Sequence, residues 1–250
     1  MPPVSTPSFE WSDAVQQLMS ARRTVLPKRL VAPGPDDAQL QLLFSAAATA
    51  PDHGQVLPWR FILVPPEQRA LLADVFGQAL LDRDMQATAE QVAQAREKAF
   101  RAPLLMLLVV DSEKGDATVD VYERMVSAGA AVQNLLLMAT ALGFGSALTS
   151  GKALKAPSFR SSFGMQDSEF APCFISVGTV KQAKPGKPRP EPASFVSTWE
   201  RPQPALADTQ MPATAMKPTA AVMLKGMSRR SSAMMPPVRA SGMPVATRKV

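Results

Sequence analysis

Residues 50–59 read Ala-Pro-Asp-His-Gly-Gln-Val-Leu-Pro-Trp and lie between a helical pattern and an apolar strand pattern. They contain His53, the only histidine of the chain, and the only cysteine is Cys173. A structural zinc site needs about four nitrogen or sulfur ligands, so this composition excludes one. The groups of this loop that could bind a ligand or take part in catalysis are therefore one imidazole, one carboxylate, a tryptophan and backbone amides. Loops between regular elements often carry binding residues on a rigid scaffold.

The charge of the chain is unevenly distributed. The formal net charge of +6 divides into 19 Lys/Arg against 20 Asp/Glu in residues 1–200, and 8 against 1 in residues 201–250. The first part is therefore near neutral at −1 and the tail carries +7, so the whole chain is not a basic nucleic-acid binder. With 250 residues and 46% hydrophobic content, the chain can form a sizeable core.

The ends of the chain differ from its middle. We expect a flexible lead over residues 1–12, a folded domain over 13–199 and a basic, disordered tail over 200–250. Residues 201–250 hold seven of the 14 methionines and seven of the 24 prolines, without aromatics or clear periodicity. Attraction of this tail to nucleic acid or to an anionic membrane surface is the open alternative.

The compartment is predicted from the cysteine count and the N-terminus. One cysteine cannot form an internal disulfide framework, which fits a reducing compartment. The first ten residues show no basic segment followed by an apolar one, so we expect no secretory signal and a cytoplasmic protein.

Apolar periodicity predicts alternating helices and strands in a mixed α/β arrangement whose strand order the pattern does not fix. Ser12 is expected to cap the first helix, and Pro35-Asp36-Asp37 to open the second, which Pro51 closes. Expected helices then follow Pro66, cover about 85–100 and 119–142, and include a short one at 157–163. Expected strands cover 59–64, 103–110, 144–148 and 173–180. The strand at 103–110 is apolar at every position, which is typical of a strand covered on both faces.

The helix at 119–142 is apolar on nearly every side from Val126 onward. A membrane span needs about 20 apolar residues, but Gln133-Asn134 at its centre argues against one because polar groups in lipid are costly. We expect a helix buried on all sides, with part of it a candidate for a subunit interface.

Three segments are candidates for binding. Arg22-Arg23-Thr24 has two guanidiniums and a hydroxyl that can hold a phosphate, or the arginines merely complement the dipole of the first helix. His53 is a candidate acid or base, or else a structural hydrogen-bonding group. The glycine-rich residues 143–151 allow the backbone to approach a flat ligand but do not form a dinucleotide-binding fingerprint. Trp59 is a core residue or a stacking platform.

Together, these segments resemble the nitroreductase family of flavoproteins, particularly its YdjA-like branch. The resemblance covers roughly residues 13–199 and rests on motifs that follow one another in the family's order. They are Arg22-Arg23-Thr24, Ala50-Pro51-Asp52-His53, Pro58-Trp59-Arg60-Phe61, Arg101-Ala102-Pro103, Ser127-Ala128-Gly129-Ala130-Ala131-Val132-Gln133-Asn134, Gly143-Phe144-Gly145, Thr149-Ser150-Gly151 and Val177-Gly178-Thr179.

The resemblance implies an α+β, nitroreductase-like fold with a central mixed sheet flanked by helices, in an intertwined homodimer that binds FMN at the dimer interface. It implies an oxidoreductase in which NAD(P)H delivers hydride to FMN and a small acceptor, a nitroaromatic or a quinone, then takes the electrons. In such enzymes the flavin carries the redox chemistry and the protein supplies position and electrostatics. No side chain is therefore expected to be catalytic itself.

The resemblance also implies a set of cofactor-binding residues. Arg22, Arg23 and Thr24 would contact the phosphate, ribityl chain or pyrimidine edge, and His53 would approach from the partner subunit. Ala147, Leu148 and Thr149 would line a face or edge of the flavin. Lys187 and Arg189 fall where a late basic residue commonly reaches the phosphate.

Two departures from YdjA-like relatives leave the function open. Thr49 stands where they have arginine before the Ala-Pro-Asp-His run, and Leu148-Thr149 stands where they have Trp-Arg. Two cationic flavin contacts are therefore absent, which predicts weaker binding, a lower reduction potential or an altered acceptor preference. A non-catalytic FMN-binding or sensor protein is the main alternative, and a dehydrogenase or flavin destructase of the same fold is another.

Overall fold

The computed structural model describes residues 9–183, 186 and 188–199. The chain divides into two units, Met1–Pro188 and Arg189–Val250. Within the described residues 189–199, the second unit contains the 3-10 helix η6 (Pro192–Ser194). The lead at residues 1–8 and the tail at 200–250 lie outside the described residues, so the predictions for them remain predictions.

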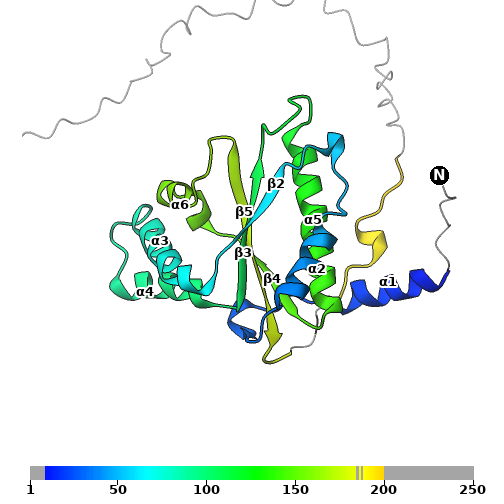
Figure 1. Cartoon of the computed structure of the whole chain (residues 1–250), viewed down its shortest axis with the longest axis horizontal. Helices are drawn as coiled ribbons and strands as arrows, with labels where there is room; N and C mark the ends of the chain where they lie inside the picture. Colours follow the sequence, from blue (N-terminus) through cyan, green and yellow to red (C-terminus); the bar gives the residue numbers. More distant parts are fainter. Residues whose placement is uncertain (1–8, 184–185, 187, 200–250) are drawn as a thin grey trace, which may run out of the picture. The chain divides into compact units, whose positions relative to one another are not determined.

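A five-stranded sheet organises the first unit (Figure 1). Its strands are β1 (Leu30–Val31), β2 (Trp59–Leu63), β3 (Leu104–Asp111), β4 (Gly145–Thr149) and β5 (Glu169–Val180). The order is β1-β5-β3-β2, and β4 also pairs with β5. The sheet expected to be mixed is antiparallel in every named strand pair. Among the described residues, its parallel contact is a single bridge between Thr24 and Ser146.

Strand β3 is buried on both faces, as its continuous apolar sequence predicts. Met106, Leu108 and Val110 belong to one core with helices α2 (Asp37–Ala47) and α5 (Val121–Ala141). The alternate residues 105, 107 and 109 belong to a second core on the other face, with α3 (Arg69–Leu81) and α6 (Pro157–Ser162). Figure 1 shows these helix pairs on opposite sides of the sheet. The result is a three-layer arrangement.

Strand β5 begins at Glu169, four residues earlier than the sequence pattern predicts. Leu108 pairs with Cys173 and Val110 with Phe170, so two residues of β5 lie opposite one residue of β3. One of the two is Pro172, which has no backbone N–H to donate. The bulge therefore accommodates the proline, which is the residue that made the first part of this strand unrecognisable in the sequence.

Several helix starts are set by side-chain caps. The Asp36 carboxylate accepts the backbone N–H of Gln39, and the Gln39 side chain accepts the N–H of Asp36, which is a capping box. Thr88 and Gln91 form the same arrangement at α4 (Ala89–Glu97). This helix covers only the middle of the predicted 85–100 segment, and the 3-10 helix η4 (Lys98–Phe100) follows it.

The first helix corrects one prediction. Helix α1 spans Phe9–Ala21, so Ser12 lies inside it instead of capping it. No glycine or proline stands between Phe9 and Ser12 to stop the helix from extending backwards. The short strand β1 and the 3-10 helices η1 (Pro27–Arg29), η2 (His53–Gln55), η3 (Pro66–Gln68) and η5 (Lys152–Lys155) carry no periodicity that the sequence could have revealed.

Helix α5 corrects a second prediction, because it is not buried on all sides of the single chain. One face packs against α2, β2 and β3. The other exposes Tyr122 at 78%, Val126 at 69%, and Gly129 and Gln133. Apolar composition cannot show whether a helix face is covered by its own chain or left for a partner. Among the described residues, no helix combines the length and the apolar character needed to cross a membrane.

Candidate functional site

The predicted segments Arg22-Arg23-Thr24 and Ala147-Leu148-Thr149 lie side by side. Thr24 forms the parallel bridge with Ser146, and the N–H of Val25 donates to the Ser146 carbonyl at 2.9 Å. The segment that follows α1 is thereby fixed along the edge of β4 that does not pair with β5. Two segments more than a hundred residues apart in the sequence thus form one surface.

Two glycines make this close approach possible. A Cβ at Gly145 would lie 2.5 Å from Val180 Cγ2 and 2.9 Å from Leu30 Cδ2, so no larger residue fits there. A Cβ at Gly186 would lie 2.2 Å from Arg23 Nε. The chain after β5 therefore passes directly against the Arg23 guanidinium.

The arginines of this surface have different surroundings. Arg23 is exposed, and its Nη1 donates to the Ser20 carbonyl and, at 3.1 Å, to the Arg22 carbonyl. These contacts place its positive charge at the C-terminal end of α1, where it complements the helix dipole. Its exposed guanidinium keeps donors available for an anion, so the two interpretations of this motif are compatible. Arg22 is half-buried.

The three predicted residues of β4 do not present their side chains alike. The side chain of Ala147 is buried within the sheet, so it can offer a ligand only its backbone. Leu148 is 44% exposed, and Thr149, whose side chain lies on the same face of the strand as that of Ala147, is half-exposed near the end of β4. Of the three, Thr149 lines a cavity.

This cavity of about 280 Å³ lies between β4, the connection after it, and helices α3 and α4. Its floor is apolar and its mouth polar. The lining residues are Pro27, Phe76, Leu80, Arg83, Ala95, Lys98, Arg101, Leu105, Thr149, Ser150, Gly151, Lys152, Ala153, Leu154, Phe174 and Ser176. At Gly151 an added Cβ would meet nothing within 4 Å, so the backbone there is open to a ligand. Such a cavity suits a flat aromatic group.

Four cations line the cavity, Arg83, Lys98, Arg101 and Lys152. Arg101 was named only as part of a family motif, and the sequence analysis missed the other three. Arg83 follows α3, Lys98 and Arg101 lie in and just after η4, and Lys152 begins η5, so only the tertiary structure brings them together. Arg101 pairs with Glu97, and this hydrogen bond, followed by the charges of Lys98 and Lys28, holds the pKa of the Glu97 carboxyl below its usual value.

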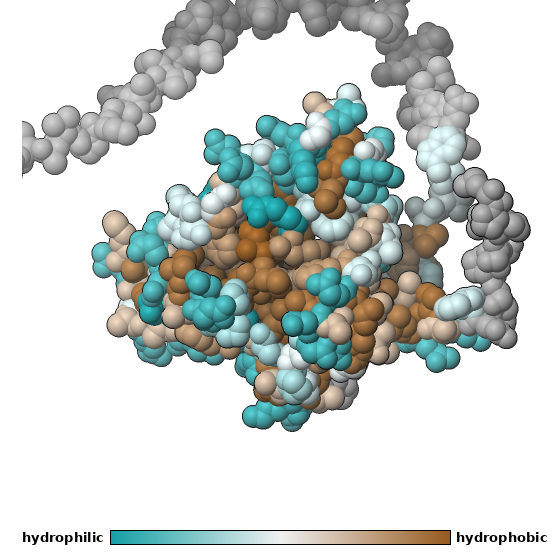
Figure 2. Space-filling view, viewed as in Figure 1, coloured by the Kyte–Doolittle hydropathy of each residue, from teal (hydrophilic) through white to brown (hydrophobic). Residues whose placement is uncertain are grey.

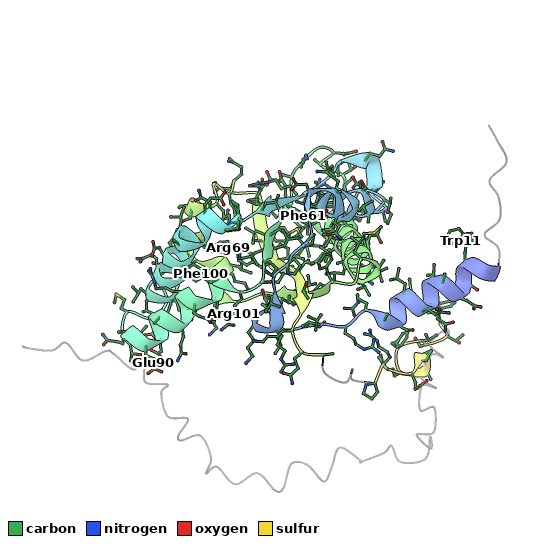
Figure 3. The ribbon with its side chains drawn as sticks, turned by 60° about the horizontal axis from the view of Figure 1, so that its bottom comes forward. Trp11, Phe61, Arg69, Glu90, Phe100 and Arg101 are labelled. Carbon is green, nitrogen blue, oxygen red and sulfur yellow. The ribbon has the colours of Figure 1, made fainter. Side chains whose placement is uncertain are left out.

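A buried arginine supports the wall that carries these cations. Arg69, at the start of α3, donates to the carbonyls of Val64 at 2.9 Å, Ala99 at 2.9 Å and Pro103 at 3.2 Å. Figure 3 shows Arg69 beside Phe100 and Arg101. Burial lowers the pKa of Arg69. Its guanidinium therefore ties the segment between η4 and β3 to the end of β2.

Thr49 and His53 lie elsewhere in the chain, against α5, and neither lines the cavity. The Thr49 hydroxyl donates to the Ala46 carbonyl at 2.8 Å and accepts from Asn134 Nδ2 at 3.0 Å. His53 Nδ1 lies 2.5 Å from Glu123 Oε2. Within one chain, then, the predicted site residues form two groups, and His53 belongs to the one that the resemblance assigns to the partner subunit's flavin.

The loop that carries His53 is held by Asp52. Its carboxylate accepts the N–H of Leu57 at 2.6 Å, and Lys114 Nζ donates to the Leu57 carbonyl at 2.8 Å. Leu57 has a φ of 46°, a left-handed conformation that is uncommon for a residue with a side chain. The adjacent Trp59 packs in the core, as one of the two predicted alternatives holds, and its Nε1 donates to Ser127 Oγ at 3.0 Å.

Other kinds of chemistry lack material in the described part of the chain. No cluster of three or more His, Cys, Asp or Glu side chains is placed there to hold a metal ion. Burial raises the pKa of the Cys173 thiol to about 11, so it is protonated at neutral pH and is not a nucleophile. Of the late basic residues, Lys187 lies outside the described residues, and Arg189 belongs to the second unit.

A family model described as "Nitroreductase family" matches residues 19–179. The chain belongs to the nitroreductase family. It is 32% identical over 186 residues to "Putative NAD(P)H nitroreductase YdjA" of Escherichia coli K12, covering 74% of this chain and 98% of that protein. The nitroreductase-like family protein from Bacillus cereus, 20% identical, matches with a TM-score of 0.63 over 80% of this chain and 100% of its own.

A second solved structure has the same fold. The "putative nitroreductase in complex with fmn" from Desulfovibrio desulfuricans is 22% identical, with a TM-score of 0.56 over 80% of this chain and 100% of its own. These likenesses confirm the predicted nitroreductase-like fold. The family match ends at residue 179, so Lys187 and Arg189 lie beyond it.

Proposed function

We propose that this nitroreductase-family chain is an FMN-dependent oxidoreductase that takes hydride from NAD(P)H and reduces nitroaromatic or quinone-type acceptors. The observation that carries the proposal is the surface formed by Arg22–Thr24 and β4, which leads into the aromatic-sized cavity. The names of its relatives and the FMN complex of the Desulfovibrio desulfuricans protein support it. For a nitro acceptor, R–NO2, NAD(P)H and one proton give R–NO, NAD(P)+ and water.

The residues present fit FMN. Arg22 and Arg23 would hold the phosphate through charge-assisted hydrogen bonds, and Thr24 would add a hydroxyl. Thr149 and the backbone of Ala147 would contact the flat ring along the edge of β4. When bound, FMN would supply two-electron chemistry between NAD(P)H and the acceptor in a ping-pong sequence. The apolar floor of the cavity would exclude water from that reaction.

The working form in this proposal is a homodimer. Helix α1 exposes Trp11 at 66%, together with Val15 and Met19 at successive helical turns, and α5 exposes Tyr122 and Val126. Figure 2 shows apolar surface over α1, and Figure 3 shows Trp11 pointing away from the body of the unit. Large apolar side chains on a helix with few contacts of its own are typical of an interface.

Dimerisation would also complete the site. Thr49 and His53 lie against the same α5 whose outer face is exposed, so a second copy packed on that face would receive them. His53 would then position the cofactor bound by the partner chain instead of acting as an acid or base. Lys187 and Arg189 are proposed as further phosphate contacts, and the cytoplasm as the compartment.

A non-catalytic FMN-binding or sensor protein is the second candidate, and the hydrogen bonds of the Thr49 side chain favour it. Its hydroxyl is already engaged with Ala46 and Asn134, so it does not replace the cationic contact that YdjA-like relatives are expected to supply. Loss of that one cationic contact would make the anionic reduced form of the flavin less stable.

The visible spectrum of the purified protein, before and after anaerobic addition of NADPH or NADH, tests the proposal. We expect a yellow protein with one FMN per chain, bleached by either nucleotide and recoloured by a nitroaromatic or quinone. Stoichiometric FMN that neither nucleotide reduces would support the sensor alternative. A colourless protein that takes up no added FMN would contradict both.

A further inference from the structure

The imidazole of His53 is engaged at one nitrogen and open at the other. Its Nδ1 lies 2.5 Å from Glu123 Oε2. Within the part of the chain that the structure describes, Nε2 has no hydrogen-bond partner, and the His53 side chain is 69% exposed. An ionised carboxylate can only accept hydrogen bonds, so Nδ1 has to carry the proton of this contact. Nε2 is then the nitrogen left for a ligand.

Other contacts already hold both members of this pair in place. The Asp52 carboxylate accepts the N–H of Leu57 at 2.6 Å, and Lys114 Nζ donates to the Leu57 carbonyl at 2.8 Å, so the loop after η2 is closed without His53. Glu123 lies in the first turn of α5, whose start is capped by Asp120. An exposed ion pair contributes little to stability. The main consequence of the contact is therefore the orientation and the tautomer of the imidazole.

The pair lies beside the exposed apolar face of α5. Val126, which is 69% exposed, follows Glu123 by three residues and is its neighbour on the helix surface. In the proposed dimer this face receives the second copy. We propose that Glu123 is a positioning residue that keeps the proton of neutral His53 on Nδ1, so that Nε2 accepts a hydrogen bond from FMN bound by the partner subunit. The inference rests on the proposed function, because that function brings FMN within reach of His53.

This assignment specifies which part of FMN can meet His53. A lone pair on Nε2 needs a donor, and FMN offers donors in the hydroxyls of its ribityl chain and in the N3–H of its ring, whereas a fully ionised phosphate only accepts. An isolated imidazole favours the opposite tautomer, with its proton on Nε2. Without Glu123, most molecules would therefore lose this acceptor. The tautomer of a histidine is commonly set in this way, by the hydrogen bond that its other nitrogen makes.

The tautomer can be measured directly, because the chain has a single histidine and its imidazole signals report His53 alone. Proton–nitrogen correlation NMR is recorded on tag-free, isotope-labelled protein at about pH 9, where an imidazole is neutral. We expect a protonated Nδ1 in the wild type and a shift towards protonated Nε2 in Glu123→Gln, whose amide can donate to Nδ1. Glu113→Gln is the matched control, because Glu113 is an exposed carboxylate of the connection between β3 and α5 and forms no hydrogen bond with His53 in the described structure.

The affinity for FMN, measured by flavin-fluorescence titration at the same pH, tests what the contact does. Glu123→Gln is expected to raise the Kd for FMN about three- to tenfold, and His53→Gln by at least as much. In the double variant, Glu123→Gln should add no further loss, since Glu123 acts through His53. A merely structural role of Glu123 would instead give losses that add.

The outcomes separate this inference from the proposed function. A protonated Nε2 in the wild type, additive losses of FMN affinity, or an equal tautomer shift in Glu113→Gln would overturn the inference. A protein that shows the expected coupling but whose FMN neither NADPH nor NADH reduces refutes only the proposed function. A protein that turns over while its FMN affinity is unchanged in Glu123→Gln refutes only this inference, and failure to bind FMN refutes both.

Discussion

Arg69 offers the sharpest test of how the cavity wall is held. Arg69 is 5% exposed, and its guanidinium donates to three backbone carbonyls, those of Val64, Ala99 and Pro103. In Arg69→Met the hydrocarbon stem is kept and all three donors are lost. Arg69→Lys keeps the charge, but its single nitrogen cannot reproduce the forked geometry.

The magnitude follows from these contacts. A hydrogen bond from a charged donor contributes about 1.5–3 kcal/mol, so three would contribute several kcal/mol. Removing the charge also removes its own desolvation penalty, which the lowered pKa of Arg69 reveals. We therefore expect Arg69→Met to lower the free energy of unfolding by about 3 kcal/mol, with a Tm lower by about 6–12 °C. The free energy of unfolding of Arg69→Lys should lie between those of the wild type and Arg69→Met.

Urea unfolding followed by circular dichroism measures this loss, and an unchanged slope would show that the unfolded state is unaffected. Arg96→Met is the control, since Arg96 lies on the adjacent α4 and, among the residues the structure describes, forms an ion pair with the exposed Asp74. That exposed pair contributes about 0.5 kcal/mol or less. If Arg69→Met lost no more stability than Arg96→Met, the assignment of Arg69 as the support of this wall would be wrong.

Three other predictions follow from particular residues. Gly145→Ala should destabilise the protein by about 1–3 kcal/mol and weaken FMN binding, because its Cβ would push β4 away from Val180; urea unfolding and an FMN titration measure both. The Arg60 guanidinium holds the pKa of the Glu169 carboxyl below its usual value, so Glu169 stabilises the protein above about pH 4.3 and this contribution is lost as pH falls towards the lowered pKa. Glu169→Gln should thus be less stable than wild type at neutral pH and differ less at about pH 3, whereas a gap independent of pH would contradict the ion pair's role. Cys173, with its pKa raised to about 11, should resist iodoacetamide at neutral pH until urea unfolds the protein; rapid alkylation of the native protein would refute its burial.

Local signals in the sequence predicted the elements that depend on local chemistry. The acidic pair at Asp36-Asp37 marks the start of α2, because a side-chain cap needs only residues within one turn. The apolar run of β3 likewise indicates a strand covered on both faces, because an apolar residue at every position means that the side chains on both faces are buried. The bulge at Pro172 shows where local signals fail. A proline normally indicates the end of a strand, but it is tolerated in β5 because the bulge places two residues of β5 opposite one of β3.

The candidate site was predictable only in part. Arg22–Thr24 and β4 were named from their motifs, but the bridge between Thr24 and Ser146 that joins them is a tertiary contact. Arg83, Lys98 and Lys152 look like ordinary solvated charges in the sequence, and the motif that contains Arg101 does not show that it lines a cavity. Ala147 matches its motif, yet its side chain is buried, since the motif does not show which positions of a strand the rest of the fold covers.

The division of the predicted residues into two groups bears on the function as much as on the fold. The cavity, Arg22–Thr24 and β4 lie together in one chain, whereas Thr49 and His53 are held against α5, beside apolar side chains that this chain leaves uncovered. In the proposed dimer, the same association buries those side chains and places His53 next to the cofactor bound by the partner. The free energy of association would then contribute to cofactor affinity, because a ligand that binds only the assembled form stabilises it. The scarcity of histidine and cysteine fits this design, since the chain has to position a redox cofactor and not to perform the chemistry with its own side chains.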